Sequence, residues 1–296
     1  SVHDAYEPRA ATAQRVLRAA RGYPDRCHAH AAAVTEAACD AETLATLSDA
    51  RIDARMMLLC NQIQDGWELS ALGVSIEGAF NRLSRRPGSL TPPPATMTST
   101  GHLAAHTAVL AGLLRRGAAG PDFAAAFDAA VREVGHRGPG EAELANPVIA
   151  DDPGLLLAAA ELAATEEALP AVEPDRPPSD PISRRIARSR SARETAWDST
   201  ARATQQLRIL LRERGSRLVT ANVIDNADDV CYLTRFELLA TPPDLRELVE
   251  RRRAEMARLQ ALSLPEVIDG QWTPAEHPAA EVAGPLAASD LADAAS

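Results

Sequence analysis

Residues 182–241 contain no proline, and this uninterrupted run constrains the fold more than any other feature of the 296-residue chain. Within it Trp197, Thr204, Leu211 and Leu218 recur at intervals of seven residues. Because an α-helix has about 3.6 residues per turn, this spacing places the four side chains on one face of a helix. The run therefore predicts a single helix of about 35 residues, roughly 50 Å long.

The composition favours helices in the rest of the chain as well. Apolar residues make up 46% of the sequence, which is enough for a core, but aromatic residues make up only 3%. Strands are enriched in β-branched and aromatic residues, whereas alanine has the highest helix propensity. We therefore predict an all-α fold, a multi-helix domain with at most one or two short strands.

Proline-rich and small-residue segments suggest how the chain is divided. Residues 170–181 are rich in proline and acidic side chains, which indicates a linker or an exposed crossing. This predicts one helical sub-domain over residues 1–169 and a second, containing the long helix, over residues 182–277. Residues 278–296 are expected to form a flexible linker.

The first of these sub-domains contains an amphipathic stretch. Four apolar residues follow one another in steps of three or four, as expected for one face of a helix: Met56, Leu59, Ile63 and Trp67. Gly66 and Gly73 lie in the same region, and because glycine weakens helices they are expected break points.

Charge and cysteine usage limit the classes of partner. The formal net charge of −10 argues against a nucleic-acid binder, and no apolar run approaches the roughly 20 residues of a membrane span. The cysteines have no closely paired spacing, which favours reduced thiols and a cytoplasmic location: Cys27, Cys39, Cys60 and Cys231. All 31 basic residues are arginine, which indicates GC-rich bacterial coding.

Residues 135–141, Gly-His-Arg-Gly-Pro-Gly-Glu, are the segment most suggestive of chemistry. Three glycines and a proline force this segment out of a helix that ends near Val134. One interpretation is structural. Cations at a helix C-terminus are favourable by about 0.3–1 kcal/mol, and His136 and Arg137 would supply them. Gly135 or Gly138 would then provide the left-handed cap.

The other interpretation is functional. Arg137 would hold a phosphate or carboxylate through its planar guanidinium group, and His136 would act as a proton acceptor. Glu141 and Glu143 would complete the substrate-binding set. Spacing alone does not decide between a helix stop and a functional loop.

No metal site is predicted. His102 and His106 lie four residues apart on a predicted helix, which is the geometry of half a metal site without its other ligands. Cys27, His28 and His30 do not have the spacing of a closed zinc site. Phosphate-binding glycine loops and the nucleophile elbow are also absent from the sequence, so no self-contained catalytic machinery is expected.

Three blocks, in order, resemble phosphoenolpyruvate synthase-like proteins, a group that includes the rifampicin phosphotransferases. The first block comprises residues 136–141, 143–147 and 151–153. The second comprises residues 193–194, 215–219, 228–234 and 237–238, and the third comprises residues 264–270. The resemblance covers most of residues 100–270, although Cys231 and Trp197 depart from the residue types usual in the family.

The resemblance implies that this chain is the central helical region of a three-part enzyme. In that family an ATP-grasp domain binds nucleotide, and a swivelling domain carries a phosphorylated histidine. The central region would bind a small-molecule acceptor, with no cofactor of its own, while the complete enzyme would use ATP and Mg²⁺. The alternative hypothesis is a non-catalytic scaffold or hinge that joins those domains or contacts a protein partner.

Overall fold

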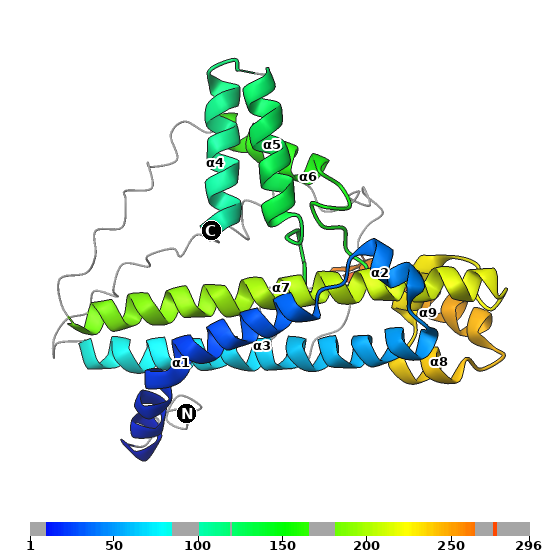
Figure 1. The fold of residues 1–296 in the computed structure, drawn as a ribbon, viewed down its shortest axis with the longest axis horizontal. Helices are drawn as coiled ribbons and strands as arrows, with labels where there is room; N and C mark the ends of the chain where they lie inside the picture. The colour runs from blue at the N-terminus through cyan, green and yellow to red at the C-terminus, as the bar shows by residue number, and fades with distance from the viewer. Residues whose placement is uncertain (1–9, 85–100, 119, 166–180, 264–274, 277–296) are drawn as a thin grey trace. The chain divides into compact units, whose positions relative to one another are not determined.

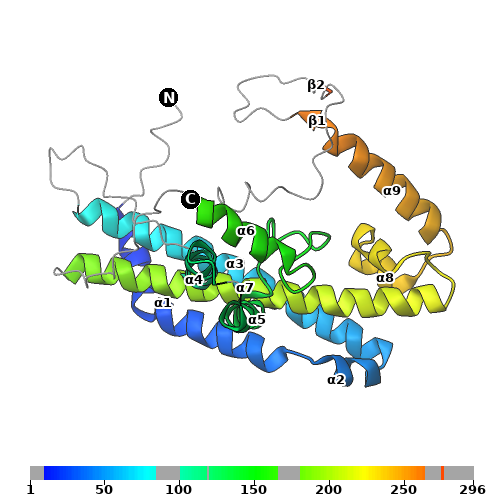
Figure 2. The same cartoon turned by 90° about the horizontal axis from the view of Figure 1, so that it is seen from above.

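The computed structural model describes residues 10–84, 101–118, 120–165, 181–263 and 275–276, and these are almost entirely helical (Figures 1 and 2). The helices are α1 (Ala10–Ala37), α2 (Ala41–Thr46), α3 (Asp49–Ser84), α4 (Gly101–Arg115), α5 (Pro121–Val134), α6 (Gly154–Thr165), α7 (Pro181–Thr220), the 3₁₀ helix η2 (Ala227–Tyr232), α8 (Arg235–Ala240) and α9 (Leu245–Gln260). Strands β1 (Leu262–Ser263) and β2 (Ala275–Glu276) form a two-residue antiparallel pair. The predicted all-α class is confirmed. None of the helices in these ranges combines the length and apolar character that a bilayer crossing requires.

Helix α7 confirms the predicted long helix and extends over 40 residues. Pro181 occupies its first turn, where a missing backbone N–H costs no hydrogen bond. Of the four residues spaced by seven, Thr204, Leu211 and Leu218 are buried and Trp197 is partly buried. The heptad spacing therefore marks the face of α7 that packs against the rest of the protein.

Helix α3 is continuous over 36 residues, so the expectation that Gly66 and Gly73 break it is wrong. Both glycines instead lie where another helix comes very close. A Cβ atom on Gly66 would overlap the Oγ1 atom of Thr200 in α7, and one on Gly73 would overlap the phenol of Tyr23 in α1. The glycines permit close helix packing, which offsets their low helix propensity.

The described residues belong to two compact units that are discontinuous in sequence. Of these residues, the first unit contains 10–38, 57–84, 101–118, 120–165 and 181–206, and the second contains 39–56, 207–263 and 275–276. Helices α3 and α7 each contribute to both units, so each unit draws on both sides of residues 170–181. Residues 166–180 and 277–296 lie outside the described residues, so the predicted linkers there remain predictions.

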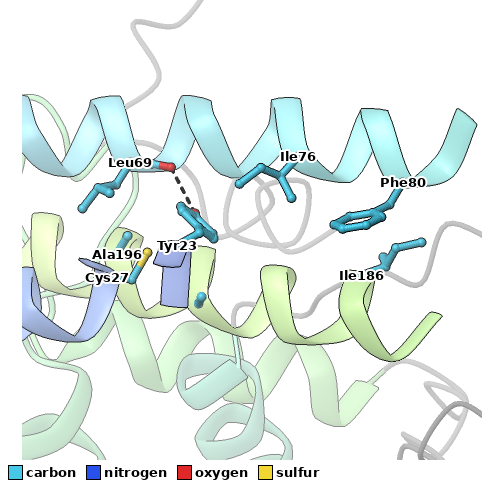
Figure 3. Packing of buried hydrophobic residues seen from close by; sticks show 8 residues of the cluster. Tyr23, Cys27, Leu69, Ile76, Phe80, Ile186 and Ala196 are labelled. Carbon is cyan, nitrogen blue, oxygen red and sulfur yellow. Dashed lines mark hydrogen bonds between the residues drawn. The ribbon is translucent and has the colours of Figure 1, made fainter. Parts of the chain in front are cut away.

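In the first unit, α1, α3 and α7 share an apolar core (Figure 3). Its buried members are Tyr23, Cys27, Leu69, Ile76, Phe80, Ile186, Ala192 and Ala196. The Tyr23 hydroxyl donates a hydrogen bond to the backbone oxygen of Leu69 at 3.0 Å, drawn as a dashed line in Figure 3. The single polar atom of this large side chain is thus satisfied inside the core, as buried polar groups require.

A second core in the same unit joins α4, α5 and α6, which stand together in Figure 1. Leu110, Val134 and Leu156 come from the three helices, and Ile149 comes from the segment between α5 and α6. Ile149 is only 1% exposed. The segment that follows α5 is therefore anchored in this core.

The second unit depends on arginine–carboxylate contacts. The Arg217 NH1 group donates to Asp49 Oδ1 at 2.8 Å and to the backbone oxygen of Leu47 at 2.7 Å. At the start of α8, Thr234 and Glu237 form a capping box. The hydrogen bond from Arg252 to Glu237, together with the Thr234 backbone N–H, lowers the pKa of Glu237 to about 2.

We predict that Gly66→Ala destabilises the protein by about 1–3 kcal/mol because the added methyl group overpacks the contact with Thr200. Gly78→Ala is the matched control on the same helix. Among the described residues, no atom beyond the adjacent helix backbone lies within 4 Å of the Cβ position at Gly78, so this change should stabilise by about 0.5–1 kcal/mol. Urea denaturation of both variants measures the difference. Equal effects of the two substitutions would show that the α3–α7 contact is not tight at Gly66.

Candidate functional site

The segment between α5 and α6, residues 135–153, forms a closed loop that we call the motif loop. The backbone N–H of Ile149 donates to the Arg137 oxygen and that of Ala150 donates to the Gly135 oxygen, both at 2.8 Å. These two bonds join the beginning of the loop to its end. The intervening residues are therefore held as one unit beside the end of α5.

Two glycines make this closure possible. Gly140 has a φ of +60°, and this left-handed conformation favours glycine. A Cβ atom on Gly138 would lie 2.8 Å from the backbone oxygen of Pro147, in the second half of the loop. The prediction that Gly135 or Gly138 is the left-handed cap is wrong, since Gly135 has a φ of −59° and the left-handed glycine of the loop is Gly140.

His136 is buried, with 7% of its surface exposed, and contacts α7. Its Nε2 atom lies 2.8 Å from Asp198 Oδ1, and the other carboxylate oxygen of Asp198 accepts a hydrogen bond from Arg202 Nε at 2.8 Å. An ionised carboxylate only accepts hydrogen bonds, so Nε2 of His136 carries the hydrogen. Burial by itself raises the pKa of Asp198, but His136 and Arg202 more than offset this effect and hold the pKa well below its usual range.

Arg137 and Glu141 form a second buried pair. Arg137 Nε donates to Glu141 Oε2 at 2.7 Å, and the two side chains are only 10% and 11% exposed. Glu141 Oε1 accepts a hydrogen bond from Trp197 Nε1 at 2.7 Å. Glu141 thus connects the motif loop to α7 while it neutralises Arg137.

Further carboxylates surround Arg137. Its NH1 group lies 3.9 Å from Asp198 Oδ1. Burial raises the pKa of Glu194 on α7, and the positive charges of Arg193 and Arg137 counteract this increase. The electrostatic environment of Arg137 is therefore mainly negative.

The structure brings three of the four predicted site residues together. His136, Arg137 and Glu141 meet the same stretch of α7, around Trp197 and Asp198. Glu143 is instead an exposed turn residue, and its Oε1 atom accepts the backbone N–H of Ala145 at 3.2 Å.

Sequence reasoning did not identify the α7 residues that complete this site. Asp198 and Arg202 are four residues apart, which is a recognisable helical ion-pair spacing, but nothing local connects them to the motif loop. Arg202 also donates to the backbone oxygen of Glu133 at 3.3 Å. Arg202 from α7 therefore supplies a cation at the end of α5, the role that the structural interpretation gave to His136 and Arg137.

A small cavity lies beside the site. Trp67 from α3 and Trp197 from α7 meet edge to face, with ring centroids 4.8 Å apart, and line it together with Glu141 and Thr204. Its volume is about 10 Å³, room for about one water molecule. Ligand pockets usually measure about 300–1,000 Å³, so this cavity is not a preformed site for a small-molecule acceptor.

Comparison with known proteins gives relatives whose names state no function. The uncharacterized proteins Mb2073c of Mycobacterium bovis and Rv2047c of Mycobacterium tuberculosis are each 34% identical to the chain over 266 residues. The matched region covers 82% of this chain but only 31% of each relative, so the chain spans about a third of their length. No protein-family model matches the chain, and no solved structure matches it significantly.

We predict that Arg137→Ala destabilises the isolated chain by about 3–5 kcal/mol, because it leaves the Glu141 carboxylate buried without its cation. Arg132→Ala is the control, since Arg132 is exposed and belongs to the end of α5, and its effect should stay within about 0.5 kcal/mol. Urea denaturation measures both. An equally small effect at Arg137 would contradict the buried pairing.

Asp198 should contribute to stability in a pH-dependent way. A carboxyl group whose pKa is depressed by folding stabilises the folded state above its unfolded pKa, and the contribution is lost as the pH falls. We predict that Asp198→Asn costs about 1–2 kcal/mol at about pH 7, a modest value because the side chain is 35% exposed.

The difference between wild type and Asp198→Asn should shrink as the pH falls below the ordinary aspartate range near about pH 3.9. Thermal unfolding of both proteins across that range gives the comparison. A difference that is independent of pH would mean that the charge of Asp198 does not matter.

Proposed function

We propose that this chain is the helical module of a longer, phosphoenolpyruvate synthase-like phosphotransfer protein, and that the motif loop is a structural clamp. The three sequence blocks that resemble that family support the first part of the proposal. The threefold greater length of the mycobacterial relatives supports it as well, since such a module is expected to work within a larger protein.

The proposal of a clamp rests on the charge of Arg137, which carboxylates in and beside the motif loop neutralise. A phosphate-binding arginine presents its guanidinium donors to the ligand, usually as a pair of parallel N–H groups. In this loop Arg137 Nε is bonded to Glu141, and carboxylates of Asp198 and Glu194 lie nearby. Those carboxylates repel an incoming anion, whereas they stabilise a buried cation that holds the loop on α7.

In this proposal the module has no cofactor, and ATP and Mg²⁺ bind to other domains of a cytoplasmic enzyme. The clamp fixes the end of α5 and the start of α6 to the long helix α7. A rigid helical framework of this kind suits a module that holds nucleotide-binding and phosphohistidine domains within reach of each other. His136 then orients Asp198 and takes no part in proton transfer.

Binding of a small-molecule acceptor is the second candidate function, and the cavity beside Trp67 and Trp197 favours it. Trp67 is 38% exposed, so its side chain is open to solvent on one side. Movement of this indole would enlarge the cavity and expose Trp197 and Glu141 to an acceptor. Two tryptophans and a carboxylate suit an apolar molecule that carries a hydrogen-bond donor.

The decisive experiment is incubation of the full-length protein with ATP labelled at the β-phosphate, followed by assay for acid-labile phosphate on the protein. We expect label on the full-length protein and none on the 296-residue chain. Labelling of the isolated chain would overturn the proposal that it is not catalytic alone, and failure of the full-length protein to label would overturn the phosphotransfer assignment.

Variants of the full-length protein separate the clamp from the acceptor site. If the loop is a clamp, Arg137→Ala lowers the melting temperature and the labelled fraction together, while Trp67→Ala changes acceptor KM no more than Val74→Ala. Val74 is the control because it is also exposed on α3. A raised acceptor KM in Trp67→Ala at an unchanged melting temperature would favour the acceptor site over the clamp.

A further inference from the structure

Helix α3 carries an exposed seam of uncharged residues. They recur at alternating steps of three and four residues, which is the spacing of a coiled-coil contact. The large apolar members are open to solvent, with Met57 45%, Trp67 38% and Val74 55% exposed. We call this surface the α3 seam, and it comprises Met57, Cys60, Gln64, Trp67, Ala71 and Val74.

The charges along the α3 seam are all negative. The sequence has no arginine, lysine or histidine between residues 56 and 81. Asp65 and Glu68 are exposed beside the seam, and among the described residues neither of them forms an ion pair. Two α3 seams would bring like charges together, which opposes their pairing. The seam therefore suits an amphipathic helix that has basic residues beside its apolar stripe.

Helix α9 has an apolar stripe that is buried in its first half and exposed in its second. Leu245 and Val249 are 1% and 3% exposed, whereas Met256 and Leu259, which continue the same stripe, are 42% and 48% exposed. Every residue from 253 to 260 is exposed. Because burial of the apolar face is the main source of stability for an amphipathic helix, the second half of α9 is a surface that suits a partner.

Arginines border the exposed half of this stripe. Arg251 and Arg258 lie seven residues apart, on the side of α9 next to Leu259. Arg258 lies 2.7 Å from Glu255, an exposed contact that contributes little in water. Within the described ranges Arg251 has no ion-pair partner. Helix α9 thus combines the apolar spacing and the positive charge that the α3 seam requires.

We propose that copies of this chain associate through these two surfaces, with the second half of α9 from one copy packed on the α3 seam of another. Met256 and Leu259 meet the seam around Trp67, and the arginine side of α9 faces the acidic side of the seam. Eight residues of α9 span about 12 Å and the seam spans about 27 Å. The contact is small, so the association is weak. It does not depend on the phosphotransfer function.

Sedimentation velocity of the 296-residue chain tests the proposal. We expect the average sedimentation coefficient to rise between about 10 µM and about 1 mM protein, as for a small interface, and to rise less at high salt. Reversal of the charge on either surface, in Asp65→Arg/Glu68→Arg or in Arg251→Glu/Arg258→Glu, should weaken association at least about tenfold.

Glu36→Arg/Asp128→Arg is the matched control for the acidic side of the seam. Both residues are exposed elsewhere in the first unit, and the substitution changes the net charge by the same amount as the seam variant. This control should associate as the wild type does. A loss as large as that of the seam variant would mean that net charge, and not the α3 seam, determines association.

A mixture of the two charge-reversed variants gives the sharpest comparison. Each variant alone brings like charges together, arginine against arginine in the first and carboxylate against carboxylate in the second. In the mixture, α9 of the first variant meets the unchanged seam of the second, and the reversed α9 meets the reversed seam. We expect the mixture to associate about as strongly as the wild type, although neither variant does so alone.

Each outcome decides for or against the contact. Wild type that stays monomeric at about 1 mM would overturn it, as would undiminished association in Met256→Ser/Leu259→Ser. A mixture that fails to associate would also overturn it, since the two surfaces would then not be partners. Thermal unfolding followed by circular dichroism shows that each variant is folded, as expected because all the substituted residues are exposed. If a double variant unfolds, Glu68→Arg and Arg258→Glu replace the pairs.

Discussion

The tight contact between α3 and α7 in the first unit is the constraint on which the candidate site depends. Gly66 faces Thr200, and there is no space for even one additional carbon atom between them. With aromatic residues at only 3% of the sequence, close packing has to come from helices that approach closely, because few side chains are large enough to fill a wider gap. Gly66 and Gly73 allow the helices to come this close.

The same contact fixes the position of the α7 residues that bind the motif loop. Trp197 and Asp198 lie within one turn of Thr200 on α7, and they are the residues to which Glu141 and His136 are bonded. Trp67, the neighbour of Gly66, packs against Trp197 from the other helix. A change in the spacing of α3 and α7 would therefore move the partners of both buried charges.

The long helix could be predicted from sequence because its signal is local. The absence of proline and the seven-residue spacing of Trp197, Thr204, Leu211 and Leu218 are both properties of one segment, and the helix has the expected character. The continuity of α3 could not be predicted, because the reason for Gly66 and Gly73 lies in Thr200 and Tyr23 on other helices. A glycine at a close contact and a glycine at a break look the same in one sequence.

Prediction of the site residues from sequence is limited in the same way. The sequence indicated that His136, Arg137 and Glu141 are chemically distinctive, and the structure places all three at one contact with α7. Their partners Trp197 and Asp198 lie about 60 residues further along the chain, and no periodicity connects them to the loop. Likewise, Glu133 lies beside His102 and His106 because α5 packs on α4. No local sequence pattern indicates this packing.

The pairing of the buried charges bears on how far the residues of the motif loop can indicate function. An arginine that is 8% exposed is stable only with a compensating anion, and a loop that must close at Gly138 and Gly140 leaves few positions from which to supply one. Glu141, four residues after Arg137, lies at such a position. Folding alone is thus a sufficient reason for the combination of two glycines, an arginine and a glutamate. For this reason the motif loop, taken alone, indicates how this segment folds more directly than it indicates a reaction.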